Sequence, residues 1–151
     1  IMKDKVISGT LINGVLNAVI NGVIQWFSFK EYAKIPVSVD SITNNDVTVL
    51  GESVHLGVML AMVLTLIAFF TIPKSNRPTL GKQVWFVLKH GFFAYGVLTG
   101  LAVAWQYSMG TVEVTPFVGT LLVGLVAGVV AAVVNYLTLK PFVGAEAEGK
   151  V

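Results

Sequence analysis

The sequence predicts an all-α membrane protein: a four-helix transmembrane bundle with a short extracytoplasmic β-hairpin between the first and second helices. Of the 151 residues, 55% are hydrophobic and 12% are charged, against about 25% charged in soluble domains. The apolar residues form four blocks, each long enough to span a bilayer, which takes about 20 helical residues. We therefore expect one transmembrane domain over residues 1–140 and a disordered cytoplasmic tail over 141–151.

The first block, residues 6–29, contains a row of carboxamides among aliphatic residues: Asn13, Asn17, Asn21 and Gln25. At about 100° per residue, steps of four keep these side chains within a wedge of about 120° along one helix. Buried amides are costly without partners, and hydrocarbon offers none. The row predicts either hydrogen bonds to neighbouring helices or a hydrated path or polar ligand site.

The segment after this block alternates apolar and polar residues over 35–39 and again over 47–49. Asn44, Asn45 and Asp46 lie between the two runs, and these residue types favour turns. We expect a β-hairpin over about 35–49. Because a lone hairpin is marginal in water, it should rest on the helix ends or meet a neighbouring subunit.

The second block covers residues 54–72 and the third 84–107, and the third contains Lys89 and His90. An ionisable group inside a membrane is a functional hypothesis by default, although Lys89 could also extend to the nearby interface. His55 begins the second block, which leaves it about 20 Å from His90 at 1.5 Å per residue. That separation is too long for one haem or zinc ion. Gly96 and Gly100 predict close helix packing.

The fourth block, residues 116–139, carries Gly124 and Gly128 at the same spacing and Asn135 near its end. In a bundle that alternates in direction, Asn13 and Asn17 should lie level with Asn135, Lys89 and His90. Asn21 and Gln25 should lie nearer the outer surface. We therefore expect these residues to form a polar thread through the bundle.

Basic residues indicate the orientation through the positive-inside rule. The side that holds both termini carries Lys3, Lys5, Lys74, Arg77, Lys82, Lys140 and Lys150. The other side carries only Lys30 and Lys34, together with several acidic residues. Both termini should be cytoplasmic, in what we expect to be a bacterial inner or plasma membrane.

Other features of the sequence argue against several classes of function. The chain has no cysteine, which excludes disulfides and thiolate chemistry, and no block contains a carboxylate or a nucleophile beside a base. We expect no enzyme activity, no cofactor or metal, and no nucleic-acid partner.

The leading hypothesis is a channel-like or permease-like protein that binds or passes a small polar or ionic solute. The contact residues would be the four amides, Asn135, Lys89 and His90. Four packed helices enclose little space, so a path would require a homo-oligomer or a larger membrane complex. The alternative is a non-transporting accessory or scaffold protein whose amides only join helices, and a lipid-modifying enzyme ranks third.

Overall fold

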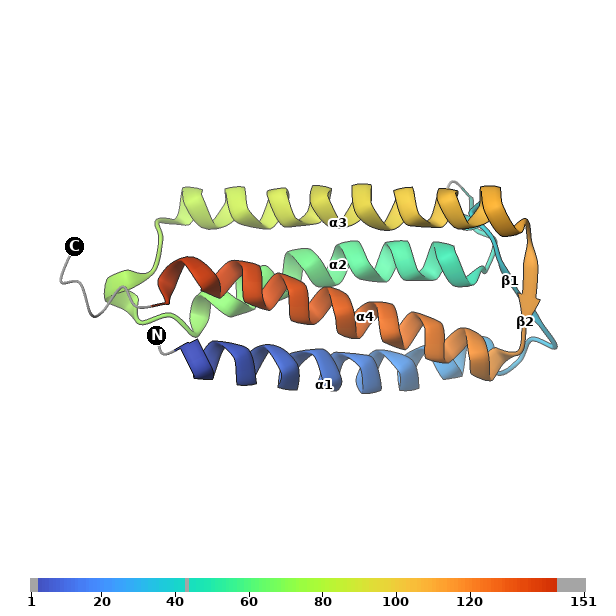
Figure 1. The fold of residues 1–151 in the computed structure, drawn as a ribbon, viewed down its shortest axis with the longest axis horizontal. Helices are drawn as coiled ribbons and strands as arrows, with labels where there is room; N and C mark the ends of the chain where they lie inside the picture. Colours follow the sequence, from blue (N-terminus) through green and yellow to red (C-terminus); the bar gives the residue numbers. More distant parts are fainter. Residues whose placement is uncertain (1–2, 43, 144–151) are drawn as a thin grey trace.

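The computed structural model describes residues 3–42 and 44–143 and consists mainly of four long helices (Figure 1). These are α1 (Lys3–Phe29), α2 (Val49–Phe70), α3 (Leu80–Met109) and α4 (Pro116–Leu139). Each is long and apolar enough to cross a membrane. The beginning of α1 and the end of α4 lie at the same end of the molecule (Figure 1). The predicted helical architecture is therefore present.

The four helices form an open bundle in which α1 and α3 lie on opposite sides (Figure 1). α4 packs along α1 and along α2, and α2 packs along α3. α3 and α4 make few contacts. As a result, α1 has α4 as its main helical neighbour and α3 has α2, which determines which polar side chains can meet.

The predicted hairpin over 35–49 is wrong. Strand β1 (Ile35–Val37) pairs in antiparallel register with β2 (Val112–Val114), which lies between α3 and α4. Ile35 is opposite Val114, and Val37 is opposite Val112. The short connection between α3 and α4 thus supplies the second strand. The sheet ties the end of α1 to the connection between α3 and α4 (Figure 1). We call the end of the molecule that holds the sheet the outer end, and the end where α1 begins and α4 ends the inner end (Figure 1).

The second apolar run, residues 47–49, does not form a strand, because it leads into α2, which begins at Val49. The hydroxyl of Thr48 accepts a hydrogen bond from the backbone N–H of Gly51 at 3.0 Å, the usual N-cap arrangement. The same hydroxyl donates to the carbonyl of Ser38 at 2.9 Å and contacts Ser41 Oγ at 2.6 Å. α2 therefore starts at Val49 rather than at residue 54, and its first turn is fastened to the segment that follows β1.

Arg77 completes the other end of α2. Its Nη2 donates to the carbonyls of Phe70 and Ile72 at 3.2 and 3.1 Å, and its guanidinium lies 5.2 Å from the centre of the Phe70 ring. The last carbonyls of a helix lack partners within the helix, and a cation there also interacts favourably with the helix dipole. Arg77 thus contributes to the structure of this connection as well as to its positive charge.

The central part of the core is rich in small side chains, whereas many large apolar side chains lie on the outside. The central cluster includes Ala61, Ala94 and Ala131. By contrast, Leu11, Phe92 and Leu125 are each more than 60% exposed. This distribution is the reverse of a soluble domain, where large apolar residues are most often buried.

The predicted tail lies largely outside the described residues. Lys140–Phe142 form a short 3-10 helix, η3, directly after α4. Residues 144–151 are not described, so their predicted disorder stays a prediction.

Candidate functional site

The most extensive helix contact in the described structure joins α1 and α4, and it determines where the amide row lies. A Cβ built on Gly128 would lie 2.8 Å from Ala18 Cβ and 2.9 Å from the carbonyl oxygen of Gly14. A Cβ built on Gly124 would lie 2.9 Å from the carbonyl oxygen of Ala18. Distances below 3.0 Å leave no room for a side chain. Glycine therefore allows the two backbones to touch, as small residues do in membrane helices.

The predicted amide row crosses this contact obliquely. Asn21 and Gln25 are 8% and 6% exposed, whereas Asn13 and Asn17 are only half-buried. Each step of four residues rotates the position by about 40°. The row therefore begins on a flank of α1 near the inner end and enters the α1–α4 contact near the outer end.

Val6 shows what this flank of α1 faces near the inner end. It belongs to an apolar cluster with Ala68 and Phe69 of α2, Ile72 directly after α2, and Leu139 of α4. Asn13 lies seven residues after Val6, which returns it to nearly the same face of the helix. Asn13 is therefore on the face of α1 that is turned toward the bundle at this end.

The asparagines bind one another in a ladder along α1. Asn17 Nδ2 donates to the backbone carbonyl of Asn13 at 2.9 Å and to its Oδ1 at 3.0 Å. Asn21 Nδ2 donates in the same way to Asn17, at 2.9 and 3.4 Å. Much of the polar capacity of the row is therefore satisfied within one helix.

Two polar atoms near the outer end of the α1–α4 contact have no hydrogen-bond partner in the described structure. They are Nε2 of Gln25 and Oγ1 of Thr120, and both are buried. Gly22 lies against Gly124, so the antiparallel helices place Gln25 and Thr120 at about the same level. An unpartnered buried polar group costs about 1–3 kcal/mol, so each of these two atoms would gain from a hydrogen-bond partner.

Asn135 is a polar residue of α4 that is hydrogen-bonded to α1. It is 6% exposed, and its Nδ2 donates to Thr10 Oγ1 at 3.0 Å. This bond joins the inner half of α4 to α1 through Thr10, and not through Asn13 or Asn17 as the sequence suggested. Thr10, the three asparagines of α1, Gln25 and Asn135 form what we call the α1–α4 polar set.

A second polar set, made of Thr65, Lys89 and His90, lies between α2 and α3. His90 is 4% exposed, and its Nδ1 lies 2.8 Å from Thr65 Oγ1. The Thr65 hydroxyl also donates to the carbonyl of Ala61 at 2.6 Å. Because that hydroxyl has one proton, it accepts from His90 Nδ1–H, which fixes the neutral tautomer. Lys89 is exposed and lies over Phe86, with 5.6 Å from its Nζ to the ring centre.

Across residues 3–42 and 44–143, no hydrogen bond joins the two sets. α1 and α3 lie on opposite sides of the bundle (Figure 1), so Lys89 and His90 are not brought beside the amides. The predicted polar thread therefore appears as two separate groups within one chain.

The two glycine pairs have different surroundings. Gly124 and Gly128 form the close contact with α1. Gly96 and Gly100 lie exposed on α3, and a Cβ built on either would meet no atom within 4 Å. Within the described residues, no helix packs against these two glycines as the sequence predicted.

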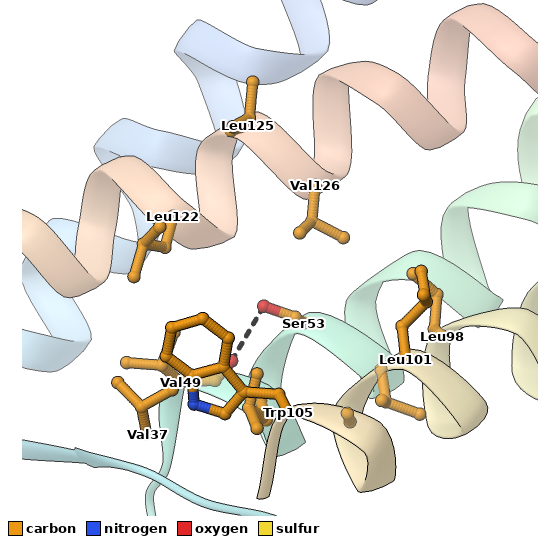
Figure 2. A pocket seen from close by; sticks show the side chains of 12 residues that line it. Val37, Val49, Ser53, Leu98, Leu101, Trp105, Leu122, Leu125 and Val126 are labelled. Carbon is orange, nitrogen blue, oxygen red and sulfur yellow. Dashed lines mark hydrogen bonds between the residues drawn. The ribbon is translucent and has the colours of Figure 1, made fainter. Parts of the chain in front are cut away.

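An apolar cavity that the sequence did not predict lies between α2, α3 and α4 (Figure 2). Its volume is about 260 Å³. Leu98, Leu101 and Trp105 of α3 face Leu122 and Val126 of α4 across it (Figure 2). Two side chains on its wall carry a polar atom, Ser53 and Trp105, and the Ser53 hydroxyl donates to the carbonyl of Val49 at 2.7 Å. The lining is otherwise aliphatic, so the cavity suits an apolar chain.

A small polar hollow of about 160 Å³ lies at the outer end, lined by the turn residues 44–46 with Ser41, Glu52 and His55. Glu52 and His55 supply two possible ligands, which are too few to hold a metal ion. The described residues contain no group of three or more His, Asp or Glu that could hold one.

Comparisons with protein-family models, curated protein sequences and solved structures found no match to this chain. The functional argument therefore rests on the geometry of this molecule.

Proposed function

We propose that the chain is an integral membrane protein with both termini in the cytoplasm, in a bacterial inner or plasma membrane. Four helices are long and apolar enough to cross a bilayer, and large apolar side chains cover their outer faces. Basic residues gather at the end where α1 begins and α4 ends, as the positive-inside rule requires of a cytoplasmic side.

Within the membrane, we propose that the protein is a non-transporting accessory or scaffold subunit. The observation that supports this choice is that the polar side chains fall into two separate groups, and that in the described structure each group has one hydrogen bond between helices. Asn135 of α4 bonds Thr10 of α1, and His90 of α3 bonds Thr65 of α2. Interhelical hydrogen bonds of this kind contribute about 0.6–2 kcal/mol each to association. The half-buried Asn13 and Asn17 are then the polar surface on which a neighbouring transmembrane helix binds.

Solute passage is the second candidate, and one observation favours it. Gln25 Nε2 and Thr120 Oγ1 are buried without a hydrogen-bond partner, and water or a small polar solute would satisfy both. A solute path at the level of Gln25 and Thr120 would also have to be enclosed by helices on all sides, and the open bundle of one chain does not enclose it. A transporting form would therefore be a homo-oligomer or part of a larger complex.

Two substitutions at Asn17 separate these functions. Asn17→Leu removes both the donor to Asn13 and the acceptor for Asn21, and Asn17→Ser is too short to bridge either residue. These hydrogen bonds lie within α1, so for a scaffold we expect both variants to lose about 0.5–1.5 kcal/mol of stability per hydrogen bond removed, seen as a lower melting temperature in detergent. Asn45→Ser, on the exposed turn, is the control and should melt like the wild type.

A liposome flux assay with several small solutes accompanies the melting curves. A scaffold should give no flux above that of empty liposomes. Transport would instead produce wild-type flux that Asn17→Leu abolishes, because leucine narrows and dewets a path, while its melting temperature holds. That result would replace the scaffold proposal with the second candidate.

A further inference from the structure

The inner end of the α1–α4 pair contains a cavity of about 310 Å³ with both charged and apolar walls. It is lined by Lys3, Val6, Ile7, Tyr136, Lys140 and Val143. Lys3 begins α1 and Lys140 follows α4, so two residues at opposite ends of the sequence share one site. The close glycine contact between the antiparallel helices brings these ends together.

The two lysines are available to a ligand. Their ammonium groups form no ion pair with any carboxylate in the described structure, where the ion pairs are Lys30–Glu31 and Lys34–Glu113. Asp4, the neighbour of Lys3, does not line the cavity. Lys140 Nζ lies 5.8 Å from the centre of the Tyr136 ring, a cation–π distance that holds the side chain on the cavity wall.

The remaining walls are apolar and continue onto the outer surface of the helices. Ile7 is 41% exposed and Tyr136 is 38% exposed, whereas Val6 is buried and closes the cavity toward α2. A ligand that fits both parts has a negative group near the lysines and hydrocarbon beside Ile7. In a membrane, that combination occurs at the level of the lipid phosphates.

We propose that this cavity binds the phosphate group of an anionic phospholipid of the cytoplasmic leaflet, with Lys3 and Lys140 as its cationic partners. The inference rests on the proposed insertion of the four helices in a bilayer, but not on the choice between scaffold and transporter. Basic pockets between transmembrane helices on the cytoplasmic side are suited to phosphate headgroups. The phosphate could also come from a free anion, so the experiment includes both sources.

The test uses the full chain in a neutral detergent, and native mass spectrometry measures bound lipid. Wild-type protein should bind phosphatidylglycerol at least tenfold more tightly than the zwitterionic phosphatidylcholine. The double variant Lys3→Gln/Lys140→Gln should weaken phosphatidylglycerol binding about thirtyfold, since each lysine near an anionic surface contributes about 1 kcal/mol, or about fivefold. Its binding of phosphatidylcholine should not change.

The matched control is Lys5→Gln/Lys82→Gln, which removes the same charge from the same end but not from the cavity. It should weaken phosphatidylglycerol binding less than threefold. An equal loss in both double variants would overturn the site, because only general attraction would then remain. Equal wild-type binding of the two lipids would also overturn it, and that measurement needs no variant.

Inorganic phosphate distinguishes the source of the ligand. At millimolar concentration it should leave bound phosphatidylglycerol in place, because it lacks the hydrocarbon that contacts Ile7. Displacement would overturn the lipid assignment and indicate a site for free phosphate. Alkaline carbonate washing of membranes that contain the protein tests insertion separately. Release into the supernatant would refute the membrane proposal itself, whereas retention without a lipid preference would refute only the site.

Discussion

The buried threonines show how one hydroxyl can either join two helices or serve only its own. Thr65 and Thr138 are both 0% exposed. Each donates to the carbonyl four residues earlier, at 2.6 Å to Ala61 and 2.7 Å to Val134. Thr65 also accepts from His90 across the α2–α3 contact. The two residues thus differ in one interhelical bond.

Replacing each threonine by valine, which has the same shape, measures that bond. Thr65→Val leaves the His90 N–H buried without a partner, so we expect a loss of about 1–3 kcal/mol. Thr138→Val removes only a bond within α4 and should cost less than about 1 kcal/mol. Melting temperatures in the same detergent compare the two. Equal losses would mean that His90 finds another partner and that this bond does not hold α2 to α3.

At the scale of helices, the same residue type has opposite roles on α3 and α4. Gly128 is enclosed by α1, whereas Gly100 faces outward with no neighbouring atom within 4 Å. Both glycines belong to rows with the same small-residue spacing. The spacing of the glycines therefore did not show that the row on α4 is packed against a helix while the row on α3 is exposed.

Gly128→Ala should destabilise the protein by about 1–3 kcal/mol, because the added methyl group overpacks the α1–α4 contact. Gly100→Ala is the control and should be neutral or slightly stabilising, because alanine favours helix more than glycine does. Chemical denaturation in detergent would compare the two variants. If Gly100→Ala were the more harmful, the glycine row of α3, rather than the α1–α4 contact, would be the critical packing surface of the protein in detergent.

The strands permit a direct test, because the chain has no cysteine. Val37 and Val112 are opposite each other in the sheet. With cysteine at both positions, a disulfide should form on mild oxidation, since facing residues of paired strands lie within its reach. Peptide mapping without reduction would detect the crosslink.

Cysteines at Val37 and Val47 provide the comparison, because these residues belonged to the two arms of the predicted hairpin. We expect little crosslinking between them. A higher yield for this pair than for Val37 and Val112 would restore the hairpin and remove the link between β1 and the α3–α4 connection.

At the scale of the whole molecule, the sheet and the basic residues lie at opposite ends. β1 and β2 close the end opposite to the start of α1 and the end of α4 (Figure 1). Lys3, Arg77 and Lys140 belong to the other end. This polarity supports a single orientation across a membrane, because long helices carry each loop to a fixed side.

A reporter that is active only in the cytoplasm should therefore work when fused to the C-terminus. The same reporter inserted between Asn44 and Asp46 should be inactive, because that turn would lie outside. Enzyme activity in intact cells, normalised to protein amount by immunoblot, measures both fusions. The reverse pattern would invert the topology and move the proposed phospholipid site to the outer leaflet.

The sequence by itself determined the four helices, because long apolar blocks need neither partners nor loops to indicate their structure. α4 spans the same residues as its predicted block, 116–139, and the row of amides on α1 followed directly from the spacing of four. Local composition also located the basic end. These features depend on neighbours along the chain, which the sequence shows directly.

Only the tertiary structure decided which elements meet. β1 pairs with a strand 79 residues away in the sequence, since Ile35 is opposite Val114. Two glycine rows with the same spacing acquired different surroundings, and the polar side chains divided between α1–α4 and α2–α3. The apolar spacing of a helix shows that it has a face to bury but not which helix will bury it. Helix neighbours are chosen by close fit across the bundle, as at Gly14 and Gly128, and that fit exists only when both helices are in place.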